Sequence, residues 1–158
     1  MDPSKLRGAF AALALLALAA LGCHRDLYCD GARCACGNQD VCEVACSEPH
    51  GCDVTCGQGT TCDVACHDDC RVSCQSSSQC HASLGLASRF ECQDVSDCVA
   101  TLDDGSTALC NRIGGCHLRC LGACDVTCTQ GSCDILCGDG QQARACPTAG
   151  RFVCGLGC

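Results

Sequence analysis

Aromatic residues are nearly absent from this 158-residue chain, which has no Trp, one Tyr and three Phe. Met occurs once and Pro three times. A core built from aromatic side chains is therefore excluded, and the smaller apolar residues that remain bury less area each. We expect such a chain to depend on covalent cross-links for its stability, and its 25 cysteines supply them.

The motifs of common enzyme classes are also missing. The sequence has no Gly-x-Ser-x-Gly, no phosphate loop, no dinucleotide fingerprint and no Cys-x2-Cys redox pair. Five His and many carboxylates occur, but no pattern places a nucleophile beside a base. We therefore expect no enzymatic activity, no catalytic residue and no cofactor.

Lysine is absent after residue 22, where all positive charge is carried by Arg. Without residues 1–22, 17 acidic residues face 8 arginines, which gives a net charge of −9. This balance argues against nucleic acid and against an anionic membrane surface as electrostatic partners. Arg in place of Lys, together with abundant Ala and Gly, also favours a GC-rich bacterial genome.

An internal repeat is the strongest pattern in the sequence. Rows of 18 residues begin at Cys62, Cys80, Cys98 and Cys116, the last row being one residue shorter. Each row carries another Cys at its thirteenth place. Self-similarity at a fixed period is the signature of a solenoid, in which each repeat packs only on its neighbours.

Two of the four rows contain short segments of the form Cys-x-Val-x-Cys, such as residues 62–66 and 70–74, and the other rows keep an apolar residue at the same places. Apolar or sulfur-bearing residues at every second place indicate β-strands, whereas a helix needs a spacing of three to four. We therefore predict an all-β fold, a small disulfide-rich two-sided β-solenoid with a coil of about 18 residues. Each coil would contribute one strand to each face.

The residues expected to point into the solenoid are mostly small. They form facing pairs within each row: Val64 with Val72, Ala82 with Phe90, Ala100 with Ala108, and Leu118 with Val126. A disulfide needs its Cα atoms about 5.5 Å apart, so a thin interior of cystine and small side chains fits this composition. Phe90 is the only Phe among these inward residues, and it faces the small Ala82, which keeps the interior volume constant from coil to coil.

We predict a single domain, residues 23–158, with six or seven coils. Residues 42–61 form a longer row than the others, and the pattern weakens after residue 133. There, residues 133–137 make a good strand, residues 143–146 a poor one, and residues 151–154 a short last one. Atypical end coils are expected because they prevent edge-to-edge pairing.

Residues 1–22 read as a secretory signal peptide rather than as part of the fold. Lys5 and Arg7 precede the apolar run GAFAALALLALAAL, which is short for a membrane span and is followed by no stop-transfer pattern. The end of this segment, Ala19-Ala20-Leu21-Gly22-Cys23, resembles the lipobox of bacterial lipoproteins, although Ala20 stands where Leu is usual. The resemblance covers this stretch alone.

This resemblance implies cleavage before Cys23 and lipidation of that residue, with diacylglycerol on its sulfur and an acyl chain such as palmitate on its amine. The protein would then be held on a membrane of the bacterial cell envelope by its lipid anchor. In similar lipoproteins an Asp after the Cys signals inner-membrane retention, and here His24 occupies that place, which favours the outer membrane. The alternative is ordinary cleavage after Gly22 and a secreted protein.

The cysteine count supports a separate role for Cys23. The total of 25 is odd, and setting Cys23 aside leaves 24 cysteines that can all pair. Two rows lack both cysteines of the first turn, with Leu84 and Ser88 or Leu102 and Ser106 in their places, and cysteines that disappear together are most simply partners. Pairing the others within rows leaves an odd number at each end, whereas pairing across turns leaves only Cys23 alone.

We therefore predict disulfides between sequence neighbours across the turns, with Leu84 and Leu102 stacked where cysteine is lacking. Four cysteines near the C-terminal end form two closing pairs whose connection stays open: Cys137, Cys146, Cys154 and Cys158. The other predicted pairs are Cys29–Cys34, Cys36–Cys42, Cys46–Cys52, Cys56–Cys62, Cys66–Cys70, Cys74–Cys80, Cys92–Cys98, Cys110–Cys116, Cys120–Cys124 and Cys128–Cys133.

A metal site is not expected, despite the cysteine content. Structural zinc sites favour Cys-x2-Cys, whereas the spacing here is Cys-x3-Cys, and Cys62 and Cys66 on one strand would lie about 13 Å apart. His81 and His117 would lie two coils apart, about 10 Å, too far to share an ion. The outward acidic residues do not follow the calcium-binding nonapeptide pattern: Glu43, Asp53, Asp63, Asp125 and Asp134.

The sequence thus predicts an envelope lipoprotein whose rigid solenoid is a structural or binding module, with a protein or glycan partner left open. The alternative is a cysteine-rich metal-sequestering protein, which would contain many free thiols. A calcium- or ice-binding solenoid is a further alternative, because disulfide-braced solenoids resemble insect antifreeze proteins. The Thr-x-Thr ladder of those proteins is absent, since the outward places hold Thr55, Ser73, Thr101, Arg119, Thr127 and Leu136.

Overall fold

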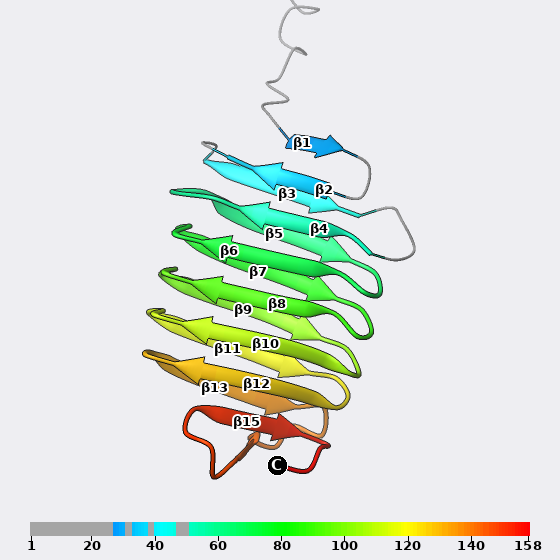
Figure 1. Cartoon of the computed structure of the whole chain (residues 1–158), viewed down its shortest axis with the longest axis vertical. Coiled ribbons are helices and arrows are strands. Elements are labelled where there is room, and N and C mark those ends of the chain that lie inside the picture. Colours follow the sequence, from blue (N-terminus) through cyan, green and yellow to red (C-terminus); the bar gives the residue numbers. More distant parts are fainter. Residues whose placement is uncertain (1–26, 31–32, 38–39, 47–50) are drawn as a thin grey trace, which may run out of the picture.

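The structure, a computed structural model, is a stack of coils in which strands alternate between two facing sheets (Figure 1). It describes residues 27–158 apart from 31–32, 38–39 and 47–50, and it describes residues 27–30 by their backbone alone. No helix occurs in this part of the chain, and therefore none there is long and apolar enough to cross a membrane.

The two sheets divide the strands between them. The nine-stranded sheet has the order β1 (Leu27–Asp30), β2 (Arg33–Cys36), β4 (Asp53–Cys56), β6 (Arg71–Gln75), β8 (Arg89–Gln93), β10 (Ser106–Asn111), β12 (Cys124–Thr129), β15 (Arg151–Cys154) and β14 (Arg144–Ala145). The six-stranded sheet has the order β13 (Ser132–Cys137), β11 (Gly115–Cys120), β9 (Asp97–Leu102), β7 (Gln79–Leu84), β5 (Thr61–Cys66) and β3 (Val41–Ala45).

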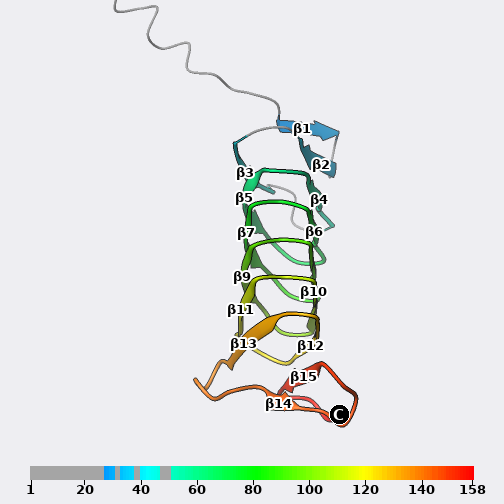
Figure 2. The same cartoon turned by 90° about the vertical axis from the view of Figure 1, so that its left-hand side faces the viewer.

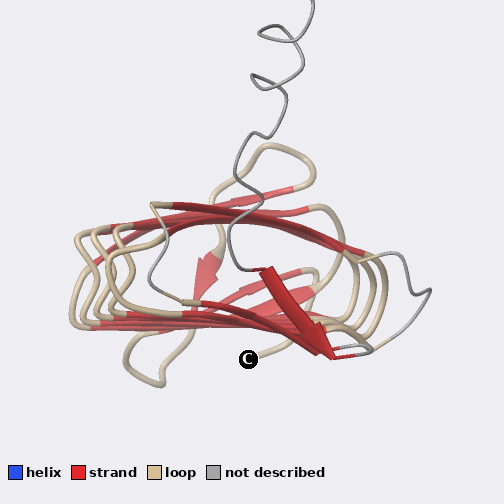
Figure 3. Cartoon of the chain, turned by 90° about the horizontal axis from the view of Figure 1, so that it is seen from above, coloured by secondary structure: helices blue, strands red, loops and turns tan. Residues whose placement is uncertain are grey.

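The predicted two-sided β-solenoid is confirmed by the strand register. Parallel neighbours in the six-stranded sheet match Cys62 with Cys80, Cys80 with Cys98, and Cys98 with Cys116, so each coil is one row of the sequence repeat. The first coil is the longer one, because Cys42 pairs with Cys62. The coils form successive rungs in the side view (Figure 2), and the two sheets form two thin layers when seen from above (Figure 3).

The interior is made of the small residues that the alternation predicts. All eight of the expected inward residues are buried, and Phe90 is completely inaccessible to solvent. Leu84 and Leu102 are register partners on β7 and β9 and are also buried, as expected for the two turns without cysteine. The period-two pattern therefore identifies the core correctly.

Backbone hydrogen bonds continue from coil to coil through the turns. The N–H of Asp69 donates to the carbonyl of Leu86 at 2.9 Å, and the N–H of Ala87 donates to that of Asp104 at 2.9 Å. Asp69, Ala87 and Gly105 occupy equivalent places in successive turns, and all have positive φ, between 55° and 73°. The turns thus repeat as regularly as the strands, and this aligns the side chains at each corner.

Antiparallel strands close both ends of the nine-stranded sheet. At one end β1 runs antiparallel to β2. At the other end, β15 runs antiparallel to β12, and the two-residue strand β14 pairs with β15. Strands therefore form where the weakened C-terminal pattern predicts them, but the reversed direction ends the parallel stacking.

Ten disulfides lie among the described side chains, and eight of them are predicted cross-turn pairs: Cys36–Cys42, Cys46–Cys52, Cys56–Cys62, Cys74–Cys80, Cys92–Cys98, Cys110–Cys116, Cys120–Cys124 and Cys128–Cys133. The two closing pairs are Cys137–Cys154 and Cys146–Cys158. Cys34 is disulfide-bonded and lies opposite Cys29 in the backbone register, although the Cys29 side chain is outside the described ones.

One predicted pair is wrong. Cys66 and Cys70 are both free thiols, although the same Cys-x3-Cys spacing is closed by a disulfide at Cys120–Cys124. The spacing along the chain is the same at the two turns. The thiol of Cys66 donates a hydrogen bond to Sγ of Cys46 in the neighbouring coil, with 3.1 Å between the two sulfur atoms.

Candidate functional site

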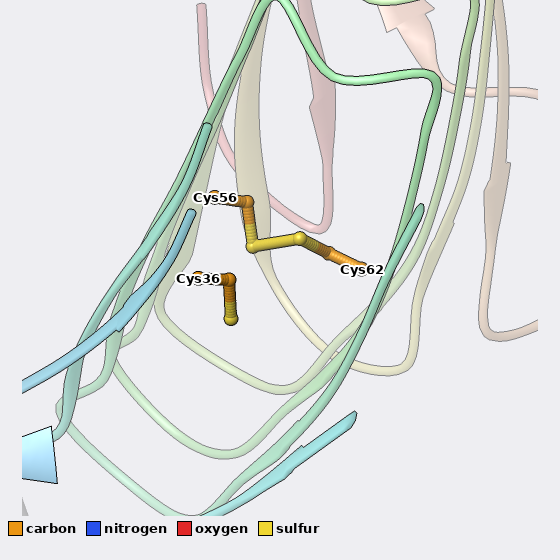
Figure 4. Close-up of side chains that lie close together, drawn as sticks. All are labelled: Cys36, Cys56 and Cys62. Atoms are coloured by element: carbon orange, nitrogen blue, oxygen red, sulfur yellow. A yellow bond between two sulfur atoms is a disulfide. The ribbon is translucent and has the colours of Figure 1, made fainter. Parts of the chain in front are cut away.

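Sulfur atoms from neighbouring coils gather in the interior between the sheets. Figure 4 shows one such group, in which Cys36 lies beside the Cys56–Cys62 disulfide of the next coil. Cys36 and Cys56 are register partners on β2 and β4. Because the cysteines recur at equivalent places in the coils, their disulfides stack on one another along the solenoid.

The described side chains contain four groups of three cysteines. Within each group, the three sulfur atoms lie within 4.8 Å of one another. Three of these groups consist entirely of disulfide-bonded cysteines: Cys36, Cys56 and Cys62; Cys110, Cys116 and Cys133; and Cys120, Cys124 and Cys154. Sulfur in a disulfide is not a thiolate, and thiolates are the metal ligands and nucleophiles of cysteine chemistry. The fourth group, Cys46, Cys66 and Cys70, is different because two of its members are thiols.

We call the four cysteines at this place, Cys46, Cys52, Cys66 and Cys70, the sulfur corner. Cys66 ends β5, and Cys70 directly precedes β6 across the following turn. Cys46 follows β3 and is bonded to Cys52, which directly precedes β4. The corner therefore combines one disulfide with two thiols from the next coil.

Backbone pairing holds the two coils of the sulfur corner in register. The N–H of Cys46 donates to the carbonyl of Ala65 at 2.9 Å, and the N–H of Arg71 donates to that of Cys52 at 2.7 Å. These bonds place Cys46 beside Cys66 and Cys52 beside Cys70. The contact between Cys66 and Cys46 thus follows from sheet register and not from a mobile loop.

The environment of the sulfur corner keeps the Cys66 thiol protonated. Cys70 is buried and Cys66 is partly buried. Burial raises the pKa of the Cys66 thiol well above its ordinary value, and the hydrogen bond and charge of the adjacent Cys70 raise it further. Two thiolates are also fewer than the four ligands that a structural zinc ion takes, so the corner is better suited to sulfur chemistry than to zinc.

Sequence reasoning missed the contact across the sulfur corner, although the signal is present. The longer first row spans residues 42–61, and exactly one such row separates Cys46 from Cys66, so the two occupy the same place in successive coils. Local spacing relates only cysteines that are neighbours along one turn, whereas this pair lies one row length apart in the sequence.

Two shallow grooves lie on the outer face of the nine-stranded sheet and share Arg89 and Thr107 as lining residues. Their volumes are about 270 and 390 Å³. Arg89 pairs with Glu91 on its own strand, with 2.5 Å between Nε and Oε1. In the smaller groove, Arg151 makes three hydrogen bonds to Asp125, so these two charges are paired within the protein.

The residues considered for metal binding are spread over both sheets. His81 and His117 lie two strands apart with Val99 between them, as predicted, and His117 lies 3.8 Å from Asp134 on the exposed face. The acidic residues are divided, with Glu43, Asp63 and Asp134 on the six-stranded sheet and Asp53 and Asp125 on the other. Among these acidic residues only Glu43 and Asp63 are register partners of each other, while Asp63 also pairs with His81, and Asp134 pairs with His117.

Compared with protein-family models, with curated proteins and with solved structures, the chain shows no match. The predicted lipidation residue, Cys23, lies outside the described residues.

Proposed function

We propose that this protein is an envelope lipoprotein, anchored by lipid at Cys23, whose residues 23–158 form a rigid structural or binding module. Support for the anchor comes from the sequence, namely the lipobox-like segment before Cys23 and the odd cysteine count. Support for the rigid module is the observation that carries this proposal: disulfides span turns of successive coils. An oxidising envelope compartment is where such bonds form and persist.

The alternative, a metal-sequestering protein, requires thiolate ligands in number. Among the described side chains, ten disulfides and the bonded Cys34 account for all cysteines except Cys66 and Cys70. Sulfur that is held in disulfides braces the coils and is not free to bind metal. The module therefore fits a role in which shape matters, as a support or as a flat surface for a protein or glycan partner.

The anchor is tested by changing Cys23→Ser and separating membranes from soluble protein. We expect wild type in the outer-membrane fraction and the variant in the soluble fraction, because the variant lacks the lipid. Cys66→Ser is the matched control, since it also removes one cysteine and should leave the distribution unchanged. If Cys23→Ser partitions like wild type, the chain is not held by a lipid at this residue.

The intact mass of the native protein reports cleavage, acylation and the number of disulfides together. Counting thiols on unfolded, unreduced protein separates the two functions. We expect few thiols for the rigid module, whereas a metal-sequestering protein would show many. The secreted alternative would give a mass without lipid and a soluble wild type.

A further inference from the structure

Of the sulfur groups along the solenoid, the sulfur corner alone brings free thiols against a disulfide among the described residues. Sγ of Cys66 lies 3.1 Å from Sγ of Cys46, which is closer than two unbonded sulfur atoms normally approach. Cys46 is bonded to Cys52, so a nucleophile and a disulfide are already in contact. Thiol–disulfide exchange needs this juxtaposition and a deprotonated attacking sulfur.

We propose that the sulfur corner is an internal thiol–disulfide exchange site, in which Cys66 attacks Cys46 and displaces Cys52. The Cys66 thiol loses its proton, a bond forms between Sγ of Cys66 and Sγ of Cys46, and the Cys46–Cys52 bond breaks. Cys52 leaves as a thiolate and takes up a proton. One disulfide and two thiols are present before and after, so the step needs no external oxidant or reductant.

The exchange moves a cross-link from within one coil to between two coils. The starting bond, Cys46–Cys52, joins the two sheets across a turn, whereas the product bond, Cys46–Cys66, joins the ends of the neighbouring strands β3 and β5. Cys52 and Cys70 then become the pair of thiols, again at equivalent places of adjacent coils. The corner thus has two covalent states of the same composition.

The surrounding coils confine the exchange to this corner. In the next two coils, Leu84 and Leu102 replace the first cysteine of the turn, and Ser88 and Ser106 replace the second. The Leu and Ser side chains at these places contain no sulfur and cannot take part in a disulfide. The equivalent turn further along is closed as Cys120–Cys124 and therefore offers no thiol to its neighbours.

The raised pKa of Cys66 explains why the starting state persists with two sulfur atoms in contact. The charged or titratable groups on its own turn are His67, Asp68 and Asp69, and the Asp68 carboxylate accepts a hydrogen bond from the N–H of Leu86. The following turn, residues 85–88, has no charged side chain. Because the thiolate of Cys66 is scarce at neutral pH, raising the pH accelerates the exchange. The rate rises about tenfold for each pH unit, as long as the pH is below the pKa.

The experiment uses the full chain under non-reducing conditions. The protein is incubated at about pH 8.5, quenched with acid, alkylated with N-ethylmaleimide and mapped as unreduced peptides. At early times we expect label on Cys66 and Cys70. With time, a pair of peptides joined by a Cys46–Cys66 disulfide appears, and the labelled fraction of Cys52 rises. This fraction should become at least about tenfold higher than in the Cys66→Ser variant.

Two variants separate the nucleophile from its neighbour. Cys66→Ser removes the attacking sulfur and should abolish label on Cys52. Cys70→Ser is the matched control and should still exchange, because Cys70 does not take part in the bond changes. Circular dichroism verifies that both variants keep their strands, and Cys66→Ala replaces Cys66→Ser if the serine variant does not.

Two results would overturn the proposal. One is a Cys66–Cys70 disulfide in the unreduced wild-type map, since the corner would then have no thiol. The other is label that stays on Cys66 and Cys70 at all times, with Cys52 unlabelled. Neither result bears on lipidation at Cys23, so the outcome is independent of the anchor.

Discussion

At the scale of single residues, hydroxyl groups replace sulfur at the two turns without cysteine. Ser88 Oγ accepts a hydrogen bond from the N–H of Cys70 at 3.1 Å, and Ser106 Oγ accepts one from the N–H of Ser88 at 3.1 Å. Both serines are almost fully buried. They satisfy backbone donors that would otherwise be buried without an acceptor, which is costly in a protein interior.

We predict that Ser88→Ala lowers the free energy of unfolding by about 1–3 kcal/mol, because the buried N–H of Cys70 loses its acceptor. Ser83→Ala, on the exposed side of β7, makes the same chemical change and should cost less than about 0.5 kcal/mol. Denaturant unfolding under non-reducing conditions measures both values. Equal effects of the two substitutions would show that the Ser88 hydrogen bond does not stabilise the turn.

At the scale of elements, several of the turns hold a non-glycine residue in a left-handed backbone conformation. Ala87 has a φ of 55°, in the left-handed region that side chains with a Cβ disfavour by about 1–2 kcal/mol. The equivalent residue of the next turn is Gly105, with a φ of 73°. Stacking imposes this conformation, since the N–H of Ala87 must reach the carbonyl of Asp104 in the next coil.

We predict that Ala87→Gly raises the free energy of unfolding by about 0.5–1 kcal/mol, as relief of the left-handed strain exceeds the added freedom of glycine in the unfolded chain. Ala65→Gly in strand β5 is the matched control, because Ala65 has no positive φ and is exposed. It should lower stability by about 0.5–1 kcal/mol. Thermal unfolding of the two variants should therefore shift in opposite directions, and a shared direction would contradict the strain argument.

At the scale of the whole molecule, disulfides take the place of a large hydrophobic core. Each cross-turn disulfide closes a loop of five to seven residues and contributes about 2 kcal/mol in the chain-entropy model. The ten disulfides among the described residues together exceed the net stability of about 5–15 kcal/mol that is usual for a domain. We therefore expect the folded state to be stable only when its cysteines are oxidised.

We predict that full reduction abolishes the strand signal of circular dichroism at room temperature. The remaining interior consists of Val, Ala, a few Leu and Ile and a single fully buried Phe, and it buries too little apolar area to offset the lost chain entropy. Oxidised protein carried through the same buffers without reductant is the control. A cooperative thermal transition that survives strong reductant would count against this dependence.

The sequence by itself determines the repeating part of this protein. A fixed row length with alternation at every second place leaves one arrangement in which Val64, Phe90 and their equivalents all point inward, and the parallel register follows from it. Most disulfides between close neighbours in sequence are predictable for the same reason, since a short turn brings their Cα atoms together; Cys66 and Cys70 are the exception. Local spacing decides the repeat and its register.

Only the tertiary structure decided what happens where the repeat is broken. The connection of Cys137 to Cys154 and of Cys146 to Cys158 depends on β15 folding back antiparallel on β12, which no local spacing specifies. Cys66 and Cys120 begin turns of identical spacing, yet one is a thiol and the other is bonded. Spacing along the chain therefore does not decide which pair is bonded. The contact of Cys66 with Cys46 comes from strand pairing across coils, because contacts between residues distant in sequence are set by packing and not by the chain between them.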